Sequence, residues 1–302
     1  MCNSTVGDDQ FEPDEAKDVR AVWRSLGLPG IIDVHTHFMP QAVIDKVWAY
    51  FDGVLPSTGI DWSITYRSDE STRVRTLEDF GVQKFTSMIY PHKPEMAEWL
   101  NSWAHDFAVR TPQCLSTATF FPEASAARYV GESIDRGVRI FKSHIQVGNY
   151  DPNNAILDQV WGQIEDAGLP VVIHCGSGPA PGRYTGPARI ESLLARFPDL
   201  ALVIAHMGMP EYSEFLRIAE RYPKTRFDTT MSFTDFTNRF ARFPDDERET
   251  LIALEDRILF GSDFPNIPYK YADALRAIVD LDLGAAWCRK VLYENALELF
   301  EL

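Results

Sequence analysis

Apolar and polar residues alternate along this chain in blocks whose lengths suit strands and helices in turn. Short apolar runs occur at residues 31–35, 84–89, 115–120, 138–142, 170–174, 200–206, 225–228 and 258–263. Segments with apolar residues at helical spacing lie at 41–51, 95–109, 124–136, 155–167, 188–196, 211–221, 245–254 and 271–279. This alternation predicts parallel strands joined by right-handed helical crossovers.

Eight strand-length runs favour closure into a barrel over an open sheet. The alternative, a doubly wound sheet, normally has a glycine-rich first turn between strand and helix, and here that turn reads HTHFMPQ. We therefore predict an α/β fold, a (β/α)8 TIM barrel in one domain over residues 29–302. An irregular insertion after the first strand, at 53–70, is a candidate lid. Residues 1–28 are expected to form a polar tail, to about residue 15, and a surface helix.

The composition fits a globular protein and argues against some partners. Of the 302 residues, 45% are hydrophobic and 24% charged, and 29 basic against 44 acidic residues give a net charge of −15. Nucleic acid or an anionic membrane surface would require a basic footprint, so neither is expected as a partner. A small-molecule substrate stays compatible, even an anionic one, because a metal ion and a local arginine can reverse the field inside a pocket.

Cysteine usage and the N-terminal segment indicate the compartment. The four cysteines show no paired spacing, and the first residues, MCNSTVGDDQFEPDEAKD, are acidic where a signal peptide would be basic and then apolar. No apolar run approaches the ~20 residues of a membrane span. We expect a reduced, cytoplasmic protein and leave its oligomeric state open, a homo-oligomer included.

Histidines and one aspartate mark the ends of four predicted strands. His35 and His37 follow the first apolar run two residues apart, so both imidazoles would project from one face of a strand. His174, His206 and Asp263 end the runs 170–174, 200–206 and 258–263. In a barrel these carboxyl ends meet at one mouth. Alone, each residue is compatible with a core histidine or a turn; together they suit Zn²⁺ or a similar divalent ion.

The segments DVHTH, VVIHCG, LVIAHMG and LFGSDFPN resemble those of the amidohydrolase superfamily. The resemblance is closer to its amidohydrolase-related branch, which includes aminocarboxymuconate semialdehyde decarboxylase and related decarboxylases and hydrolases, and it runs from about residue 31 to the C-terminus. It implies a barrel with a catalytic metal at its mouth, bound by His35, His37, His174 and Asp263. It also implies that His206 acts as an acid or base beside metal-bound water, and Asp263 would share that catalytic role.

Three further residues are candidates for substrate binding. Lys142 lies in RIFKSH, within the fourth strand, with His144 on the same face. In binuclear members of the superfamily a carboxylated lysine there bridges two metals, whereas the resembled branch typically has one metal. We expect Lys142 and His144 to contact substrate; a bridging carbamate and a buried lysine satisfied by carbonyls are the alternatives. Arg183, in GSGPAPGRYTGP, could clamp a carboxylate or lie exposed in its loop.

These observations together favour an enzyme. We predict a metal-dependent hydrolase that uses one divalent ion, Zn²⁺ by default with Mn²⁺ or Fe²⁺ as alternatives. The ion would activate its bound water against a small carbonyl, lactone or carboxylate-bearing substrate. The first alternative is a metal-dependent decarboxylase of an unsaturated or aromatic acid. A non-catalytic metal-binding barrel, with a site closed by protein ligands, ranks lower, as does a metal-free barrel of the same superfamily.

Overall fold

The computed structural model describes residues 13–302. The polar tail predicted to end near residue 15 therefore falls largely outside the described residues, and helix α1 (Pro13–Ser25) begins where the description begins. Trp23 of α1 donates from Nε1 to the carbonyl of Phe80 at 3.0 Å, which fixes this helix against the body. No helix within the described residues has the length and apolar character needed to cross a membrane.

The strands pair in parallel and follow one another around a ring. Those of residues 13–302 are β1 (Ile31–Asp33), β2 (Val82–Thr86), β3 (Cys114–Leu115), β4 (Thr117–Thr119), β5 (Ile140–His144), β6 (Val171–His174), β7 (Leu202–Ile204), β8 (Arg226–Asp228) and β9 (Ile258–Leu259). They form two sheets, β1-β2-β3 and β4 to β9 in order. Only Ser116 separates β3 from β4 in the chain, so these two strands connect the sheets on one side. On the other side the Val34 amide, just after β1, donates to the Phe260 carbonyl, just after β9, at 2.9 Å and joins the remaining two edges.

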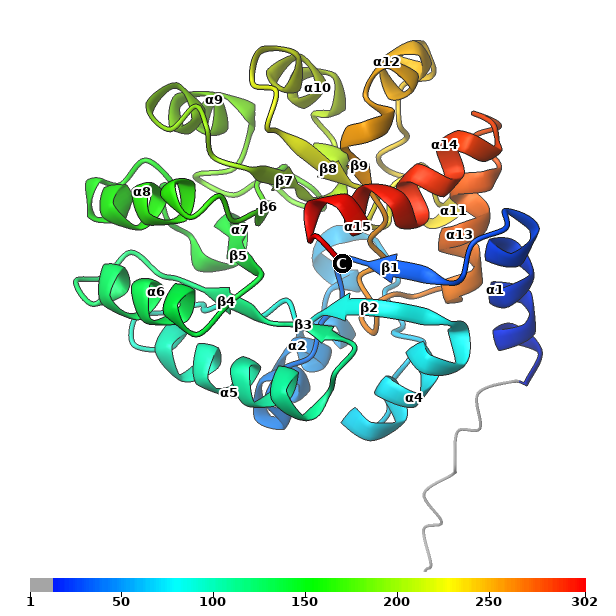
Figure 1. The fold of residues 1–302 in the computed structure, drawn as a ribbon, viewed down its shortest axis with the longest axis horizontal. Helices are drawn as coiled ribbons and strands as arrows, with labels where there is room; N and C mark the ends of the chain where they lie inside the picture. The colour runs from blue at the N-terminus through cyan, green and yellow to red at the C-terminus, as the bar shows by residue number, and fades with distance from the viewer. Residues whose placement is uncertain (1–12) are drawn as a thin grey trace, which may run out of the picture.

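This arrangement confirms the predicted (β/α)8 barrel, and the helices surround it (Figure 1). The main ones are α4 (Glu70–Phe80), α5 (Ala97–Arg110), α6 (Ala126–Asp135), α8 (Asp158–Asp166), α9 (Pro187–Arg196), α10 (Tyr212–Arg221), α12 (Arg248–Ala253) and α13 (Tyr271–Val279). Short helical turns lie between these elements: α7 (Ile145–Gly148), η1 (Ala155–Leu157), η2 (Ala205–Gly208), α11 (Asp235–Asn238), η3 (Asp245–Glu247) and η4 (Glu255–Arg257).

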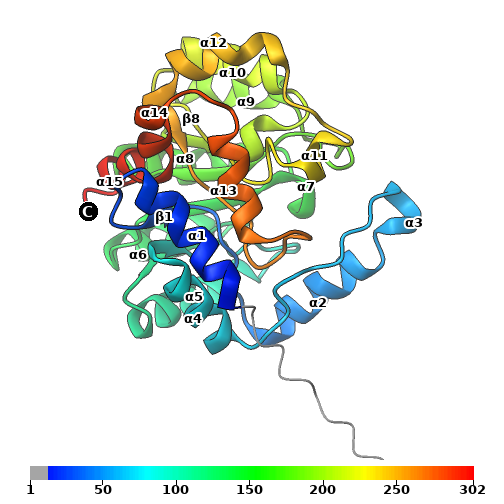
Figure 2. The same cartoon turned by 90° about the vertical axis from the view of Figure 1, so that its right-hand side faces the viewer.

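The two ends of the barrel carry different additions. At one end α14 (Ala285–Arg289), η5 (Lys290–Glu294) and α15 (Asn295–Leu299) lead to the C-terminus, while at the other α2 (Gln41–Asp52) and α3 (Leu55–Thr58) project away from the body (Figure 2). Helix α4 and the segment 285–299 are not among the helices predicted from the sequence. Helix α4 was not predicted because its sequence, ESTRVRTLEDF, is mostly polar. Its buried residues are Arg73, Thr76, Leu77 and Phe80, of which only two are apolar.

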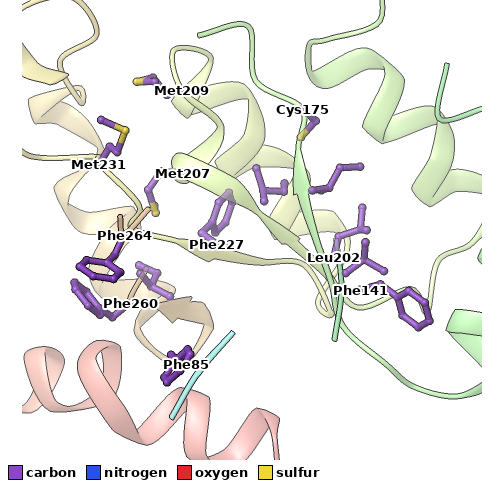
Figure 3. Packing of buried hydrophobic residues seen from close by; sticks show 14 of the residues in the cluster. Phe85, Phe141, Cys175, Leu202, Met207, Met209, Phe227, Met231, Phe260 and Phe264 are labelled. Carbon is purple, nitrogen blue, oxygen red and sulfur yellow. The ribbon is translucent and has the colours of Figure 1, made fainter. Parts of the chain in front are cut away.

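Apolar side chains fill two layers of the barrel. Inside the strands lies a cluster that includes Ile32, Ile140, Val172, Val203 and Leu259, closed at the C-terminal-helix end by Ala296 and Phe300. Between strands and helices lies a larger layer in which Phe141, Leu202 and Phe227 pack (Figure 3). Alternating strand residues serve the two layers, as the pleat of a strand requires.

The last strand is shorter than predicted. The extended run expected over 258–263 stops at Leu259, and Asp263 has a φ of 72°. Likewise β7 ends at Ile204, so that His206, with a φ of 56°, lies in a left-handed turn. Neither side chain therefore continues the alternation of its strand. Backbone hydrogen bonds to neighbouring strand ends, such as Asp263 N to His35 O at 2.8 Å, replace the ladder there.

Candidate functional site

Three buried side chains converge just beyond the carboxyl ends of β1 and β9. Asp263 Oδ1 lies 3.6 Å from His35 Nε2 and 2.8 Å from His37 Nε2. The centroids of the two imidazole rings are 5.2 Å apart. Within the described residues, one potential ligand atom from each of the three lies within 4.8 Å of the others. The backbone fixes them: His37 N donates to Phe264 O at 2.6 Å, and Asp263 N donates to His35 O.

Hydrogen bonds on the far side of each ring determine which nitrogen carries the proton. His35 Nδ1 lies 2.9 Å from Asp228 Oδ2, and His37 Nδ1 lies 2.7 Å from the carbonyl of Met88. Both partners can only accept, so each Nδ1 carries a hydrogen and donates it. In the neutral rings each Nε2 is left with a lone pair directed at Asp263. A carboxylate or carbonyl behind a histidine is the usual orienting partner of a metal ligand.

This arrangement fits a divalent cation. Two imidazole lone pairs face a carboxylate oxygen at 2.8 and 3.6 Å, and acceptors so close repel one another unless a positive charge lies between them. Two nitrogens and a carboxylate oxygen are also a donor set that Zn²⁺, Mn²⁺ or Fe²⁺ accepts. The chemistry of the donors therefore supports the predicted metal, and His35, His37 and Asp263 could hold it.

The charge states of these groups suit the same role. Burial and the nearby Lys142 ammonium lower the pKa of His35 to about 3. Burial alone would raise the pKa of Asp263, but positive charge at the position of the neighbouring imidazoles, His37 first, lowers the pKa of that carboxyl below its ordinary value, and a bound cation would supply such a charge. Near neutral pH the imidazole of His35 is therefore neutral and Asp263 is an anion, as metal ligands must be.

Asp228 is a site residue that the sequence reasoning missed. Its Oδ2 accepts from His35 Nδ1, and its Oδ1 accepts from the amides of His206 at 2.9 Å and Thr230 at 3.1 Å. The side chain is fully buried, and its pKa is lowered despite burial because His35 stabilises the anion. A signal was present: Asp228 ends the apolar run 225–228, as Asp263 was expected to end its own.

The other predicted histidines lie beside the three-residue cluster. His206 lies 5.3 Å from His35 between ring centroids, and its Nδ1 donates to the Thr230 carbonyl at 3.1 Å. His174 lies 4.8 Å from His206 and stacks on His144 at 4.2 Å, while its Nε2 donates to Gly178 O at 3.3 Å. The structure therefore brings His174 to the same mouth, although its nitrogens are not part of the closely spaced group of ligand atoms.

Lys142 and Arg183 are placed very differently. Lys142 is fully buried, and its Nζ lies 3.1 Å from His35 Nε2. Burial lowers the pKa of this amine to about 8, opposed by Asp228 and Asp263. The guanidinium of Arg183 lies over the ring of Tyr184, 5.1 Å from its centroid, and Arg183 is not among the residues that line the cavity described next.

A cavity of about 810 Å³ opens above the cluster. Its floor is polar and consists of His35, His37, Lys142, His144, His174, His206 and Asp263. Its walls are largely apolar and come from α2, from the start of α5 and from Trp62, Met209 and Met231. A concave apolar site with a few convergent polar groups at its base is typical of small-molecule binding sites.

Known structures of the same fold share this barrel at low sequence identity. An uncharacterised TIM-barrel protein from Bordetella bronchiseptica is 20% identical with a TM-score of 0.73, covering 90% of this chain and 98% of its own. A 5-carboxyvanillate decarboxylase from Sphingomonas paucimobilis is 16% identical with a TM-score of 0.65, covering 91% and 100%. A probable 2-pyrone-4,6-dicarboxylic acid hydrolase from Acinetobacter baumannii, with citric acid bound, is 16% identical with a TM-score of 0.60, covering 90% and 100%.

The family comparison is more specific than the structural one. None of the curated proteins matches the sequence. A family model described as amidohydrolase, however, matches residues 32–302, which is nearly the whole chain and includes all the residues of the site. This protein belongs to the amidohydrolase family.

Proposed function

We propose that this protein is a metal-dependent hydrolase that adds water to a small carbonyl or lactone substrate, including one that bears a carboxylate. Membership of a metal-dependent family supports this proposal. The observation that carries it is the meeting of two imidazole lone pairs and the Asp263 carboxylate at the floor of an open cavity. A site that opens into a cavity leaves room for water and substrate, which distinguishes catalytic metal centres from structural ones.

His35, His37 and Asp263 would hold the metal, and we propose His174, at the same mouth, as the fourth ligand. When bound, a divalent ion polarises a substrate carbonyl and lowers the pKa of water from about 15.7 toward ~7. The protein supplies the orientation. Asp228 and the Met88 carbonyl keep the two imidazoles in the tautomer that directs Nε2 toward the site.

His206 is the proposed acid and base. Its Nδ1 donates to the Thr230 carbonyl, so its Nε2 has the lone pair and can take a proton from water. The same nitrogen can then deliver that proton to the leaving group. Burial lowers the pKa of His206, which keeps the imidazole neutral and ready to accept a proton at neutral pH. Lys142, His144 and Arg183 stay proposals for substrate contacts, with Lys142 best placed because its amine reaches His35.

The second candidate is a carboxy-lyase, and the apolar walls of the cavity favour it. A carboxylate that meets the polar floor of a cavity walled by Val43, Val47 and Met96 loses part of its hydration, whereas the neutral product CO₂ has little hydration to lose. The charged reactant is therefore disfavoured relative to the product. The same cluster would bind the acid, and His206, after taking a proton from water, would deliver it to the carbon that loses CO₂.

One screen separates the two reactions. The full chain is stripped of metal, reloaded separately with Zn²⁺, Mn²⁺ or Fe²⁺, and given a panel of lactones, amides, esters and aromatic or unsaturated acids. Water addition and CO₂ release are measured for each compound. Metal-dependent water addition supports the hydrolase, and metal-dependent CO₂ release supports the carboxy-lyase. Activity that survives complete metal removal contradicts both.

The role of His206 has its own test. We expect His206→Asn to retain the metal and to lose activity by ~10²–10⁴-fold, because proton transfer by a positioned group contributes about this much. The matched control is His105→Asn, the same chemical change on α5 at a residue that does not line the cavity. Loss of metal from the His206 variant would show instead that this imidazole is a ligand.

A further inference from the structure

The space above the metal-ligand cluster exceeds what one aromatic ring would fill. We infer that the substrate carries an apolar body larger than a single ring, which packs against α2, Trp62 and Trp99 while its carbonyl or carboxylate meets the polar floor. This inference rests on the proposed function, because it takes the His35, His37 and Asp263 cluster as the reacting end. It concerns the size and polarity of the substrate, which the reaction class alone leaves open.

The volume is the first observation. The cavity measures about 810 Å³, whereas an apolar cavity of about 150 Å³ is enough to hold benzene. A single-ring acid bound at the floor would leave most of this space to water against apolar walls. Filling that space with a second ring removes the water and gains the hydrophobic free energy of its burial.

The chemistry of the walls is the second observation. Val43, Val47 and Phe51 project from α2 into the cavity, and Met96 and Trp99 face it from the start of α5. Glu95 and Asp263 are the only acids among the described residues that line the cavity, and Asp263 belongs to the floor. Lys46 and Lys93 also line the cavity outside its floor, and both are exposed, as is Glu95. An apolar body therefore meets no buried charge along the wall, and it loses little on leaving water.

The rim is the third observation. Tyr50 is 65%, Trp99 49% and Val147 41% exposed, and these three come from α2, α5 and α7. All three line the one cavity. Large apolar side chains that gather in one exposed place usually mark a binding surface. A substrate body that rises from the floor would cover them.

The wall formed by α2 is preformed. Phe51 stacks on Trp62 with ring centroids 4.9 Å apart, and Trp62 Nε1 donates to the Asn266 carbonyl at 2.7 Å. Trp48 Nε1 donates to Asn266 Oδ1 at 3.0 Å. Asn266 follows Asp263 by three residues, so the projecting helix is tied to the segment that carries a metal ligand. A wall held in this way pays little ordering entropy on binding.

The test compares two acids that differ by one ring. Dissociation constants of benzoate and 2-naphthoate are measured by calorimetry on the zinc-loaded full chain, independently of any turnover. We expect 2-naphthoate to bind at least tenfold more tightly, because the second ring buries additional apolar surface. Trp99→Ala should reduce this preference to less than threefold without changing the affinity for benzoate. The control on the same helix is Val109→Ala, which is 71% exposed and outside the cavity.

A second variant reduces the space beside the wall instead of enlarging it. Val47→Trp should fill the space beside α2 and weaken 2-naphthoate binding while benzoate binding is kept. Equal affinity for the two acids, or a preference that neither variant changes, overturns the inference. Turnover of single-ring substrates without a size preference overturns it too and leaves the proposed function standing. A size preference in a protein that turns over nothing in the screen supports the inference and contradicts the proposed function.

Discussion

The two ends of the barrel interior are built from the same strands and could hardly differ more in chemistry. At the end closed by α15, the strands contribute Ile32, Ile140, Val172, Val203 and Leu259, which pack against Phe300. The same five strands, or the turns after them, present histidines and Asp263 at the other end, and β5 presents a buried lysine as well. The distance between the two ends is only a few residues along each strand.

This difference separates stability from chemistry within one core. Apolar residues at the closed end gain free energy from burial. Polar groups at the open end cost free energy of desolvation and are retained only because they pair with one another. Substitutions at the closed end should therefore lower the stability with little effect on metal binding or turnover. Substitutions at the open end should remove metal and activity and leave the fold intact.

The largest effect is expected from His35→Ala combined with His37→Ala, which changes only the open end. We expect bound metal to disappear and activity to fall by at least ~10⁴-fold, because two of the three closely spaced ligands are lost. Circular dichroism should show an unchanged barrel, and metal content is measured by elemental analysis. Full metal occupancy in this double variant would refute the ligand assignment.

The complementary substitution is Leu259→Ala, which changes only the closed end. Leu259 is fully buried in β9, and its truncation leaves a cavity that the surrounding strands fill only partly. We expect a loss of about 3 kcal/mol in the free energy of unfolding, measured in urea on the metal-free protein. Metal affinity should stay within twofold of the wild type. A large loss of metal affinity at this position would show that the two ends are coupled.

Much of this division could be read from the sequence, because it depends on local pattern. The alternation of apolar runs and amphipathic helices gave the barrel, and the resemblance of four short segments gave the family, which the match over residues 32–302 confirms. The convergence of His35, His37 and Asp263 also follows from their positions at strand ends. These features need only the order of the strands and the end of the barrel at which each residue lies.

Features that depend on packing between distant segments were harder to predict. Asp228 looks like any aspartate at a strand end until His35, 193 residues away, is placed against it. Helix α4 is polar enough to be missed, although Arg73 within it is fully buried between the rings of Phe38 and Trp48. The direction of a loop is not fixed by pattern, so the sequence left Arg183 open between a carboxylate clamp and an exposed position; in the structure its guanidinium lies over Tyr184 and it does not line the cavity.

Asp228→Asn sharpens the comparison within the open end. The substitution keeps the shape of the side chain but removes the negative charge behind His35. We expect metal affinity to fall by about 10- to 100-fold, the usual cost of altering the partner of a histidine ligand. Competition with a chromophoric chelator measures the change. Asp256→Asn, a largely exposed aspartate on η4, serves as control. Unchanged affinity in the Asp228 variant would mean that the Asp228 charge does not act on the ligands.

The smallest effect should be the part of the pH dependence of stability that the histidines of the open end contribute. Burial lowers the pKa of His35 to about 3 and also lowers the pKa of His206, from 6.5 in both cases. The unfolded chain therefore binds protons below pH 6.5 that the folded chain does not bind. The contribution of these two histidines to the stability of the metal-free protein should be complete above pH 6.5 and should fall as the pH drops below it, by at most about 1.4 kcal/mol per pH unit for each such histidine. Asp33, whose pKa burial raises to about 7, contributes with the opposite sign, so the effect of the histidines is measured as a difference between wild type and variant.

Urea unfolding of the metal-free protein at pH 7.5, 6.5 and 5.5 measures this slope. His206→Asn should lose less stability on acidification than the wild type, because asparagine does not titrate. The sign of this difference is informative, since a histidine stabilised as a cation would make the wild type gain stability on acidification relative to the variant. An identical slope in the wild type and the His206 variant would contradict the view that the open end keeps this imidazole neutral at the expense of stability in acid.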